Sequence, residues 1–311
     1  YTVINSPHEE VVIRAIADVE YHTTFLDALG VNDSHKIILH VGGVYGDQVE
    51  SIRRWVSAYA ILSVRARARL VLENDDQHYT FEDVYGISQK CQIPILFDYF
   101  HHLCHHEGAY DLHDILRRVV NTWQAKDGSF KLHYSEQDLS KRKGAHAPSI
   151  TMQNFMDFYK EVKSYNPFIM IEAKNKNIAA VKAKNCIAIV EETVRPRDVI
   201  EEWSKYKYVI MSYGYEHYKH IQKMMSTACT LQELYEALEE IMSSSKVDSA
   251  KTNTLSHVWG YLKDHANTKE KNHYFKLADN LETLDLAKDY LYKLCIKYQM
   301  DYLLQSYYFH F

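Results

Sequence analysis

Short apolar runs alternate with longer amphipathic segments along the first 190 residues of the chain. Runs of four to six such residues between polar boundaries are typical of buried parallel strands. Five of the runs end in a possible metal ligand: His40, Glu73, Asp98, His133 and Glu172. We expect helices between them at 8–30, 47–62, 80–91, 111–123, 151–162 and 177–185. The pattern predicts an α/β fold of the TIM (β/α)8-barrel type.

The polar residues at the strand ends indicate a metal centre. In a barrel of parallel strands the carboxyl-terminal ends meet on one face, where active sites lie. Imidazoles and carboxylates without cysteine favour manganese, or zinc in a polynuclear hydrolase. His101 and His102 closely follow Asp98, so either of them can supply a further metal ligand beside it. Lys131 lies two residues before His133 on the same side of its strand, so we expect it to be chemically altered or to neutralise an anion there.

The strand count is too small for a closed barrel. Residues 1–7 read as the end of a strand entering a loop, and only five further strands follow. Because a barrel of this type needs eight strands, the sequence looks like one that lacks its first three. We therefore expect an N-terminally truncated barrel, a fragment, over residues 1–190.

After about residue 196 the strand signals stop and helical periodicity continues to the C-terminus. The apolar spacing predicts helices at 198–218, 231–243, 252–265, 269–276 and 283–308. We expect residues 196–311 to form a separate, all-α domain.

Charge and cysteine content restrict the possible partners and compartment. The net charge of −5 and the pI near 6.4 exclude a generally basic nucleic-acid binder, so any DNA contact needs a local patch or bound cations. Candidate patches are the Lys141–Lys143 run and the group Arg65, Arg67 and Arg69. Five scattered cysteines without a CxxC pair indicate a reducing compartment, and the lack of an 18-residue apolar run argues against a membrane span.

Six short motifs together resemble a known family. They are His40-Val-Gly-Gly, Leu72-Glu-Asn-Asp-Asp76, Phe97-Asp98 followed by His101-His102, Lys131-Leu-His133, Gly144-Ala-His146 and Ile171-Glu172-Ala-Lys174. In this order they are similar to the successive motifs of bacterial UV damage endonucleases, which are TIM barrels related to endonuclease IV. The resemblance covers about residues 1–185. The region after residue 196 more weakly resembles a helical domain of unknown function that is sometimes fused to such enzymes.

The resemblance implies an activity and a set of site residues. The family nicks double-stranded DNA on the 5′ side of UV lesions, pyrimidine dimers and 6-4 photoproducts, and binds up to three divalent ions, typically Mn²⁺. Carried over by position, the metal ligands are His40, Glu73, Asp98, His101, His133, His146 and Glu172. The catalytic set is Glu73, Lys131 and Glu172, with Lys131 open to carboxylation. Tyr1 matches the tyrosine that probes the lesion.

Some alternatives remain open at this stage. The family pattern places a histidine where this chain has Phe100, so either His101 or His102 can be the ligand. A sugar isomerase or epimerase uses similar ligands on the same barrel, although the ordered motifs favour the endonuclease. An inactive fragment that binds DNA or metal is a further possibility. We expect a monomeric, cytoplasmic bacterial protein that associates with the nucleoid when it acts.

Overall fold

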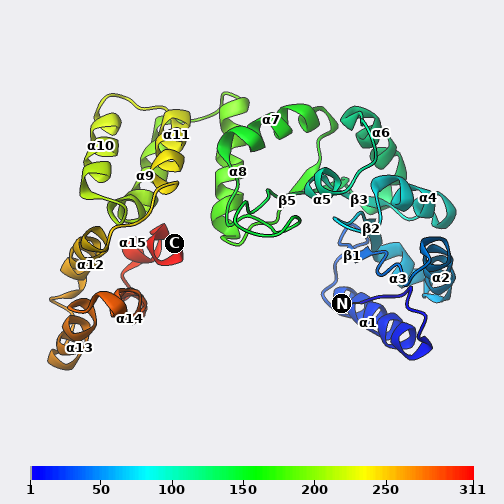
Figure 1. The fold of residues 1–311 in the computed structure, drawn as a ribbon, viewed down its shortest axis with the longest axis horizontal. Helices are drawn as coiled ribbons and strands as arrows, with labels where there is room; N and C mark the ends of the chain where they lie inside the picture. Colours follow the sequence, from blue (N-terminus) through cyan, green and yellow to red (C-terminus); the bar gives the residue numbers. More distant parts are fainter. Residues whose placement is uncertain (1) are drawn as a thin grey trace. The chain divides into compact units, whose positions relative to one another are not determined.

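The computed structural model describes residues 2–311, so Tyr1, the candidate lesion-probing residue, lies outside the described part. The chain forms two compact units, which divide between Ala180 and Val181 (Figure 1). The sequence pattern suggested a boundary between residues 190 and 196 instead. The two units are described separately.

The first unit is built on a parallel sheet whose strands follow one another in sequence order. The strands are β1 (Ile37–His40), β2 (Leu70–Glu73), β3 (Ile95–Asp98), β4 (Lys131–Tyr134) and β5 (Phe168–Ile171). The register aligns His40 with Glu73 and Asp98 with His133, and Glu172 follows β5 directly. The five predicted strands are therefore confirmed, and their ends lie within one residue of the predicted ones, since β4 ends at Tyr134 and β5 at Ile171.

Helices connect each strand to the next. Those that match the predicted segments are α1 (Glu9–Ala28), α2 (Gln48–Ile61), α4 (Phe81–Cys91), α6 (Leu112–Thr122), α7 (Met152–Val162) and α8 (Asn177–Val190). The last continues beyond its predicted end at residue 185. Two short helices were not predicted, α3 (Val64–Arg69) and α5 (Tyr99–Cys104), because six residues are too few to show a helical period.

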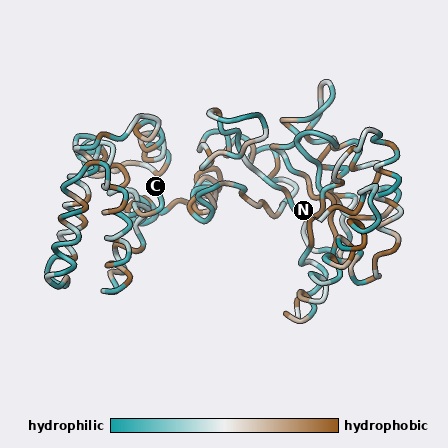
Figure 2. Tube along the Cα trace, turned by 60° about the horizontal axis from the view of Figure 1, so that its bottom comes forward, coloured by the Kyte–Doolittle hydropathy of each residue, from teal (hydrophilic) through white to brown (hydrophobic). Residues whose placement is uncertain are grey.

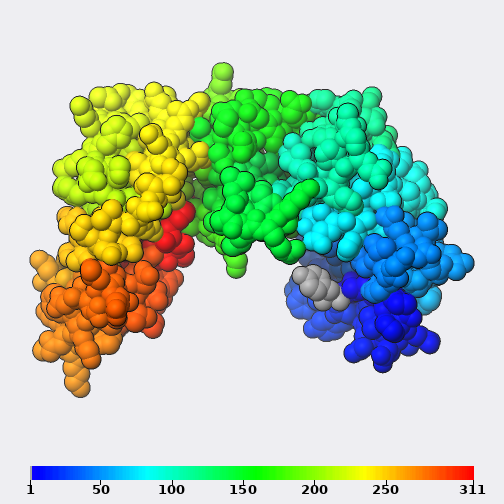
Figure 3. Space-filling model, viewed as in Figure 1, coloured from blue at the N-terminus to red at the C-terminus, as the bar shows by residue number. Residues whose placement is uncertain are grey.

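The core of this unit lies along the central strands. Every residue of β2 and β3 is buried, and Phe81 of α4 packs against Phe97 of β3 with ring centroids 5.7 Å apart. In Figure 2, brown hydrophobic stretches alternate with teal hydrophilic ones along the trace. On the surface in Figure 3, the colours pass from blue through cyan to green, so successive βα segments lie beside one another. On β5, Phe168 and Met170 remain 66% and 51% exposed.

The second unit, residues 181–311, is helical throughout. Its helices after α8 are α9 (Pro196–Met211), α10 (Tyr215–Ser226), α11 (Leu231–Met242), α12 (Asp248–Leu262), α13 (Thr268–Ala278), α14 (Leu284–Lys297) and α15 (Asp301–Leu304), and a last 3-10 turn is Tyr307–His310. The predicted single helices at 198–218 and 283–308 are wrong, since each is interrupted. Gly214 is extended at the first break, and Gln299 adopts a φ of 53° at the second.

Within residues 2–311, no helix has both the length and the apolar content needed to cross a bilayer.

Candidate metal centre

Three buried side chains meet at the carboxyl-terminal ends of β2, β3 and β4. Glu73, Asp98 and His133 each offer a ligand atom, and these atoms all lie within 4.8 Å of one another. Glu73 is 3% exposed, Asp98 0% and His133 2%. Two carboxylates and one imidazole at this spacing, shielded from water, form a pocket suited to a divalent cation.

His133 is the link between the carboxylates. Its Nδ1 lies 2.8 Å from Oε1 of Glu73 and 3.1 Å from Oε1 of Glu172. Burial disfavours the charged imidazole, but the hydrogen bonds with Glu172 and Glu73 outweigh it and raise the pKa of His133 to about 10. The same hydrogen bond from His133 lowers the pKa of Glu172. The site thus has an excess of negative charge that attracts a cation.

The surroundings of Asp98 raise the pKa of its carboxyl group, whereas those of Glu172 lower it. Burial raises the pKa of Asp98 to about 6, and the nearby Glu73 carboxylate acts in the same direction, while His101 and His133 oppose it. A buried carboxylate of this kind is stabilised as an anion by any positive charge placed next to it. The position therefore favours cation binding.

Three further histidines surround the buried trio. Nε2 of His40 lies 3.3 Å from Glu73, and Nδ1 of His101 lies 3.5 Å from Asp98. Nδ1 of His146 lies 3.6 Å from the Glu172 carboxylate. All seven ligand candidates from the sequence thus lie near one another at the carboxyl-terminal ends of the strands.

The side chains of His101 and His102 lie in different surroundings. The Asp98 side chain accepts a hydrogen bond from the backbone N–H of His101 at 2.7 Å, which fixes the first turn of α5 and directs the His101 ring toward Asp98 and Glu73. The His102 ring instead packs beside Phe97 and Tyr110 at centroid distances of 5.3 and 4.5 Å. Of the two, His101 has the geometry of a ligand.

Lys131 lies at the other end of β4 from the cluster. Its Nζ lies over the rings of Phe168 and Trp123, 5.0 and 5.6 Å from their centroids. Burial, and to a smaller extent the charge of Lys36, lowers the pKa of Lys131. Such an environment favours the neutral amine, which is the form that reacts with carbon dioxide.

Several ligand atoms have no hydrogen-bond partner in the described residues. Oδ2 of Asp98, Nε2 of His133 and Nδ1 of His40 are buried in this way. Buried polar atoms are normally satisfied, so each is a place where a further group is expected. Because these atoms are oxygen and imidazole nitrogen without thiolate, the residues fit a manganese- or zinc-class ion.

Asn74 was missed in the sequence as a functional residue. It is fully buried, donates from Nδ2 to the Asp98 carbonyl at 2.9 Å and accepts from the Asp98 N–H at 3.0 Å. Its own carbonyl lies 3.0 Å from Nδ1 of His101. It therefore holds β3 and α5 in place beside the cluster. The sequence could only suggest turn chemistry for Asn74-Asp75-Asp76.

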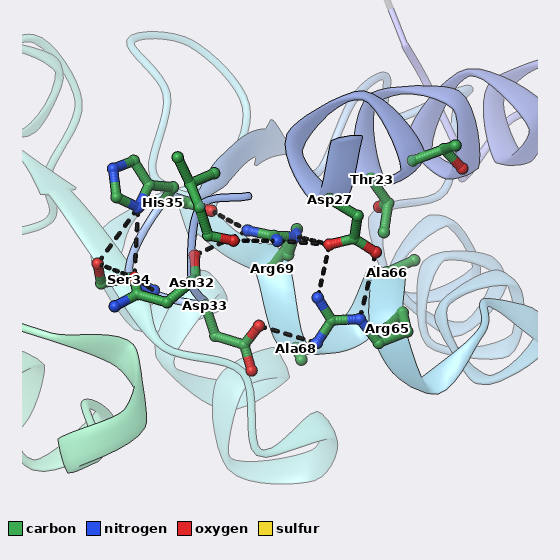
Figure 4. Close-up of polar contacts among 12 residues, drawn as sticks. Thr23, Asp27, Asn32, Asp33, Ser34, His35, Arg65, Ala66, Ala68 and Arg69 are labelled. Atoms are coloured by element: carbon green, nitrogen blue, oxygen red, sulfur yellow. Dashed lines mark hydrogen bonds and ion pairs between the residues drawn. The ribbon is translucent and has the colours of Figure 1, made fainter. Parts of the chain in front are cut away.

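Two of the arginines proposed as phosphate contacts, Arg65 and Arg69, form ion pairs with Asp27. Arg69 is 0% exposed and binds Asp27 and the carbonyls of Val31 and Asn32 (Figure 4). Arg65 pairs with Asp27 at 2.6 Å. Arg69 cannot make the predicted contact with DNA, because its side chain is buried and its charge is matched. For Arg65, whose side chain is 52% exposed, the contact stays a prediction.

Comparison with known proteins adds a second line of evidence. Residues 1–200 match the family model for UV-endonuclease UvdE, and residues 207–311 match a protein family of unknown function, DUF1722. A UV DNA damage endonuclease from Clostridium perfringens (strain 13 / Type A) is 38% identical over 99% of this chain and 74% of its own length. One from Bacillus cereus (strain G9842) is 32% identical over 65% of this chain and 64% of its own.

A solved structure, described as the crystal structure of SacUVDE, has a TM-score of 0.57 and 35% sequence identity. The match covers 62% of this chain and 64% of that one. Fold and site together define a barrel-type α/β protein with a candidate divalent-metal centre at the carboxyl ends of its strands. The chain belongs to the UV-endonuclease UvdE family, and not to the sugar isomerases that the ligand pattern alone allowed.

Proposed function

We propose that this protein is a metal-dependent endonuclease that nicks double-stranded DNA on the 5′ side of UV lesions. The observation that carries the proposal is the buried Glu73–Asp98–His133 cluster in a chain of the UvdE family. The relatives named above are called UV DNA damage endonucleases, which supports the same substrate for this protein. We further propose that it acts as a monomer in the bacterial cytoplasm, on the nucleoid.

Glu73 is the central residue of the proposed site. Its carboxylate lies 2.8 Å from His133, 3.3 Å from His40 and 3.8 Å from His101. A carboxylate that lies among three imidazoles is placed to share the binding of a divalent ion with them. We propose that up to three Mn²⁺ ions bind to His40, Glu73, Asp98, His101, His133, His146 and Glu172.

Divalent ions held by these residues would supply a water nucleophile at neutral pH and would stabilise charge on the attacked phosphate. The role of the protein would be to hold the metal-binding atoms rigidly in place. Glu172 is less buried than Glu73, with side chains 32% and 4% exposed, so it stands nearer to the entering DNA. His146 contacts the Glu172 carbonyl at 3.2 Å and orients that residue.

Lys131 is the proposed carboxylated residue. Alternate residues of a strand point to the same side, so Lys131 shares a side of β4 with His133, and its lowered pKa favours the neutral amine that can form a carbamate. A carbamate would replace the positive charge of the lysine by a negative one two residues before His133. If so, Lys131→Ala loses activity, and a small carboxylic acid such as acetate restores part of it. Absence of any restoration in an otherwise folded variant would argue against the modification.

Selection of damaged DNA would depend on how the lesion weakens base stacking and pairing. A cross-linked pyrimidine pair stacks and pairs poorly, so extruding it costs a few kcal/mol less than extruding intact bases. Tyr1 is proposed to fill the space that this leaves.

The test is a nicking assay on UV-irradiated and intact duplexes with Mn²⁺. The wild type is expected to cut only the irradiated duplex. Glu172→Gln should lower the rate at least about a hundredfold while binding to damaged DNA persists, because it removes charge from the metal site. Glu161→Gln, an exposed carboxylate on α7, should behave as wild type. Equal cutting of both duplexes, or no cutting by the wild type, would refute the proposal.

A further inference from the structure

A single leucine projects from the loop that joins β4 to α7. Leu139 is 94% exposed, the largest exposed fraction among the large hydrophobic side chains of residues 2–311. An isolated exposed leucine is common on protein surfaces. What distinguishes this one is how firmly the surrounding loop holds it.

Leu139 lies at the corner of a tight turn. The N–H of Lys141 donates to the Asp138 carbonyl at 3.0 Å and closes the turn. The Asp138 carboxylate accepts from the Ser140 hydroxyl at 2.6 Å and pairs with Lys141 at 2.9 Å and with Lys174 at 3.4 Å. The Lys174 contact connects the turn to the segment after β5. The backbone on both sides of Leu139 is thus fixed.

The base of the loop is equally constrained. The N–H of Asp138 donates to the Ala145 carbonyl at 2.7 Å, and Gln137 bridges the loop by accepting from the Gly144 N–H at 2.9 Å. Gly144 has a φ of +82°, and a Cβ there would overlap the carboxylate of Asp76, just beyond β2. The positive φ favours glycine at this position, and any other residue would displace the Asp76 carboxylate. The loop therefore spans the carboxyl face from β4 toward β2.

The same loop carries a ligand candidate and a positive patch. His146, near its end, contacts Glu172 of the metal centre. Lys141, Arg142 and Lys143 directly follow the turn and are exposed. An apolar tip, three cations and a metal ligand are thus held on one rigid segment at the face where DNA is expected. Duplex DNA fits this combination because phosphates attract the cations and an apolar side chain can enter between base pairs.

We propose that Leu139 inserts between base pairs beside the lesion as a wedge that helps to keep the damaged duplex open. This inference rests on the proposed function and adds a positioning residue to it. Leu139 forms no bond with the reacting phosphate. It acts by replacing lost base stacking, while the cations next to it contact the backbone.

The test compares Leu139→Ala with Leu139→Met and with Val49→Ala, a 79% exposed aliphatic residue of α2. Binding is measured with an irradiated duplex that carries 2-aminopurine opposite the lesion, whose fluorescence rises when the base unstacks. Leu139→Ala is expected to weaken binding to irradiated DNA about tenfold and to reduce the fluorescence rise, because a leucine side chain is no longer buried. Leu139→Met should restore both, and Val49→Ala should change neither.

The outcomes separate this proposal from the one it rests on. If the wild type neither binds nor cuts irradiated DNA, the proposed function fails. If the wild type does both and Leu139→Ala gives the same affinity and fluorescence rise, the wedge is wrong. Equal weakening on irradiated and intact DNA also overturns it, since this would mark a general contact. Thermal unfolding of Leu139→Ala should match wild type, as the side chain is in solvent.

Discussion

At the scale of single residues, buried charge has two separate uses in the first unit. Around the metal centre, buried carboxylate and imidazole atoms of Asp98, His133 and His40 have no hydrogen-bond partner among the described residues. At the turn after α1, Arg69 is fully buried but its guanidinium is matched by Asp27 and by backbone carbonyls. Because a fully matched charge attracts no ligand, only the first arrangement reads as functional.

The Asp27 pairs predict a pH dependence of stability. The hydrogen bonds from Arg65 and then from Arg69 lower the pKa of Asp27 from 3.8 to about 2. A lowered pKa stabilises the fold above the unfolded-state value and loses that effect as pH falls through the folded-state value. Asp27→Asn should therefore lower Tm at pH 7, and its difference from wild type should shrink between about pH 4 and pH 2.

Calorimetric scans across this range would measure the difference, with Glu107→Gln, an exposed residue, as the control. A gap between Asp27→Asn and wild type that stays constant down to pH 2 would mean that the ion pairs are not its cause.

The two adjacent histidines give a second prediction at this scale. His101→Ala should weaken Mn²⁺ binding by about tenfold or more, because its ring lies beside Asp98 and Glu73. His102→Gln should leave the affinity unchanged, since its ring packs with Phe97. Titration calorimetry on both variants measures this. The reverse ranking would show that the ligand is His102.

The geometry of the site explains which of its residues could be predicted from the sequence. His40, Glu73 and His133 were predictable because each ends an apolar run, and parallel strands bring such ends together. The choice between His101 and His102 depends on the direction of α5, which Asp98 sets by capping its first turn. Asn74 acts through its backbone and amide contacts, which leave no pattern in the sequence.

At the scale of elements, periodicity located strands and long helices but not their interruptions. The break at Gly214 divides one amphipathic stretch into α9 and α10, and apolar spacing continues across it. Helix α4 begins with a reciprocal capping box, which Thr80 and Asp83 form.

This cap gives an element-scale prediction. The Thr80 side chain accepts from the Asp83 N–H, and the Asp83 carboxylate accepts from the Thr80 N–H at 2.9 Å. Thr80→Ala should reduce the free energy of unfolding by about 1 kcal/mol, because the first turn of α4 loses an acceptor. Thr24→Ala, an exposed position inside α1, is the control. Denaturant melts that show equal effects for both variants would contradict a capping role.

At the scale of the whole molecule, the chain consists of two compact units with different physical character. The first has a candidate metal centre on a parallel sheet. The second is helical and has a buried polar network of its own. In it, Glu202 is 2% exposed and accepts hydrogen bonds from Tyr235 at 2.8 Å and Tyr307 at 3.4 Å. These contacts join α9, α11 and the C-terminal turn, which lie far apart in the sequence.

The network predicts that the units can be perturbed independently. Tyr235→Phe should destabilise the second unit by about 1–3 kcal/mol, because it leaves the buried Glu202 carboxylate one donor short. Tyr215→Phe, on an exposed ring of α10, is the matched control and should have little effect. If the proposed function is right, nicking of irradiated DNA under folding conditions should remain at the wild-type rate in both variants. All ligand candidates lie in the first unit, so loss of nicking in Tyr235→Phe without global unfolding would show that the helical unit takes part in the reaction.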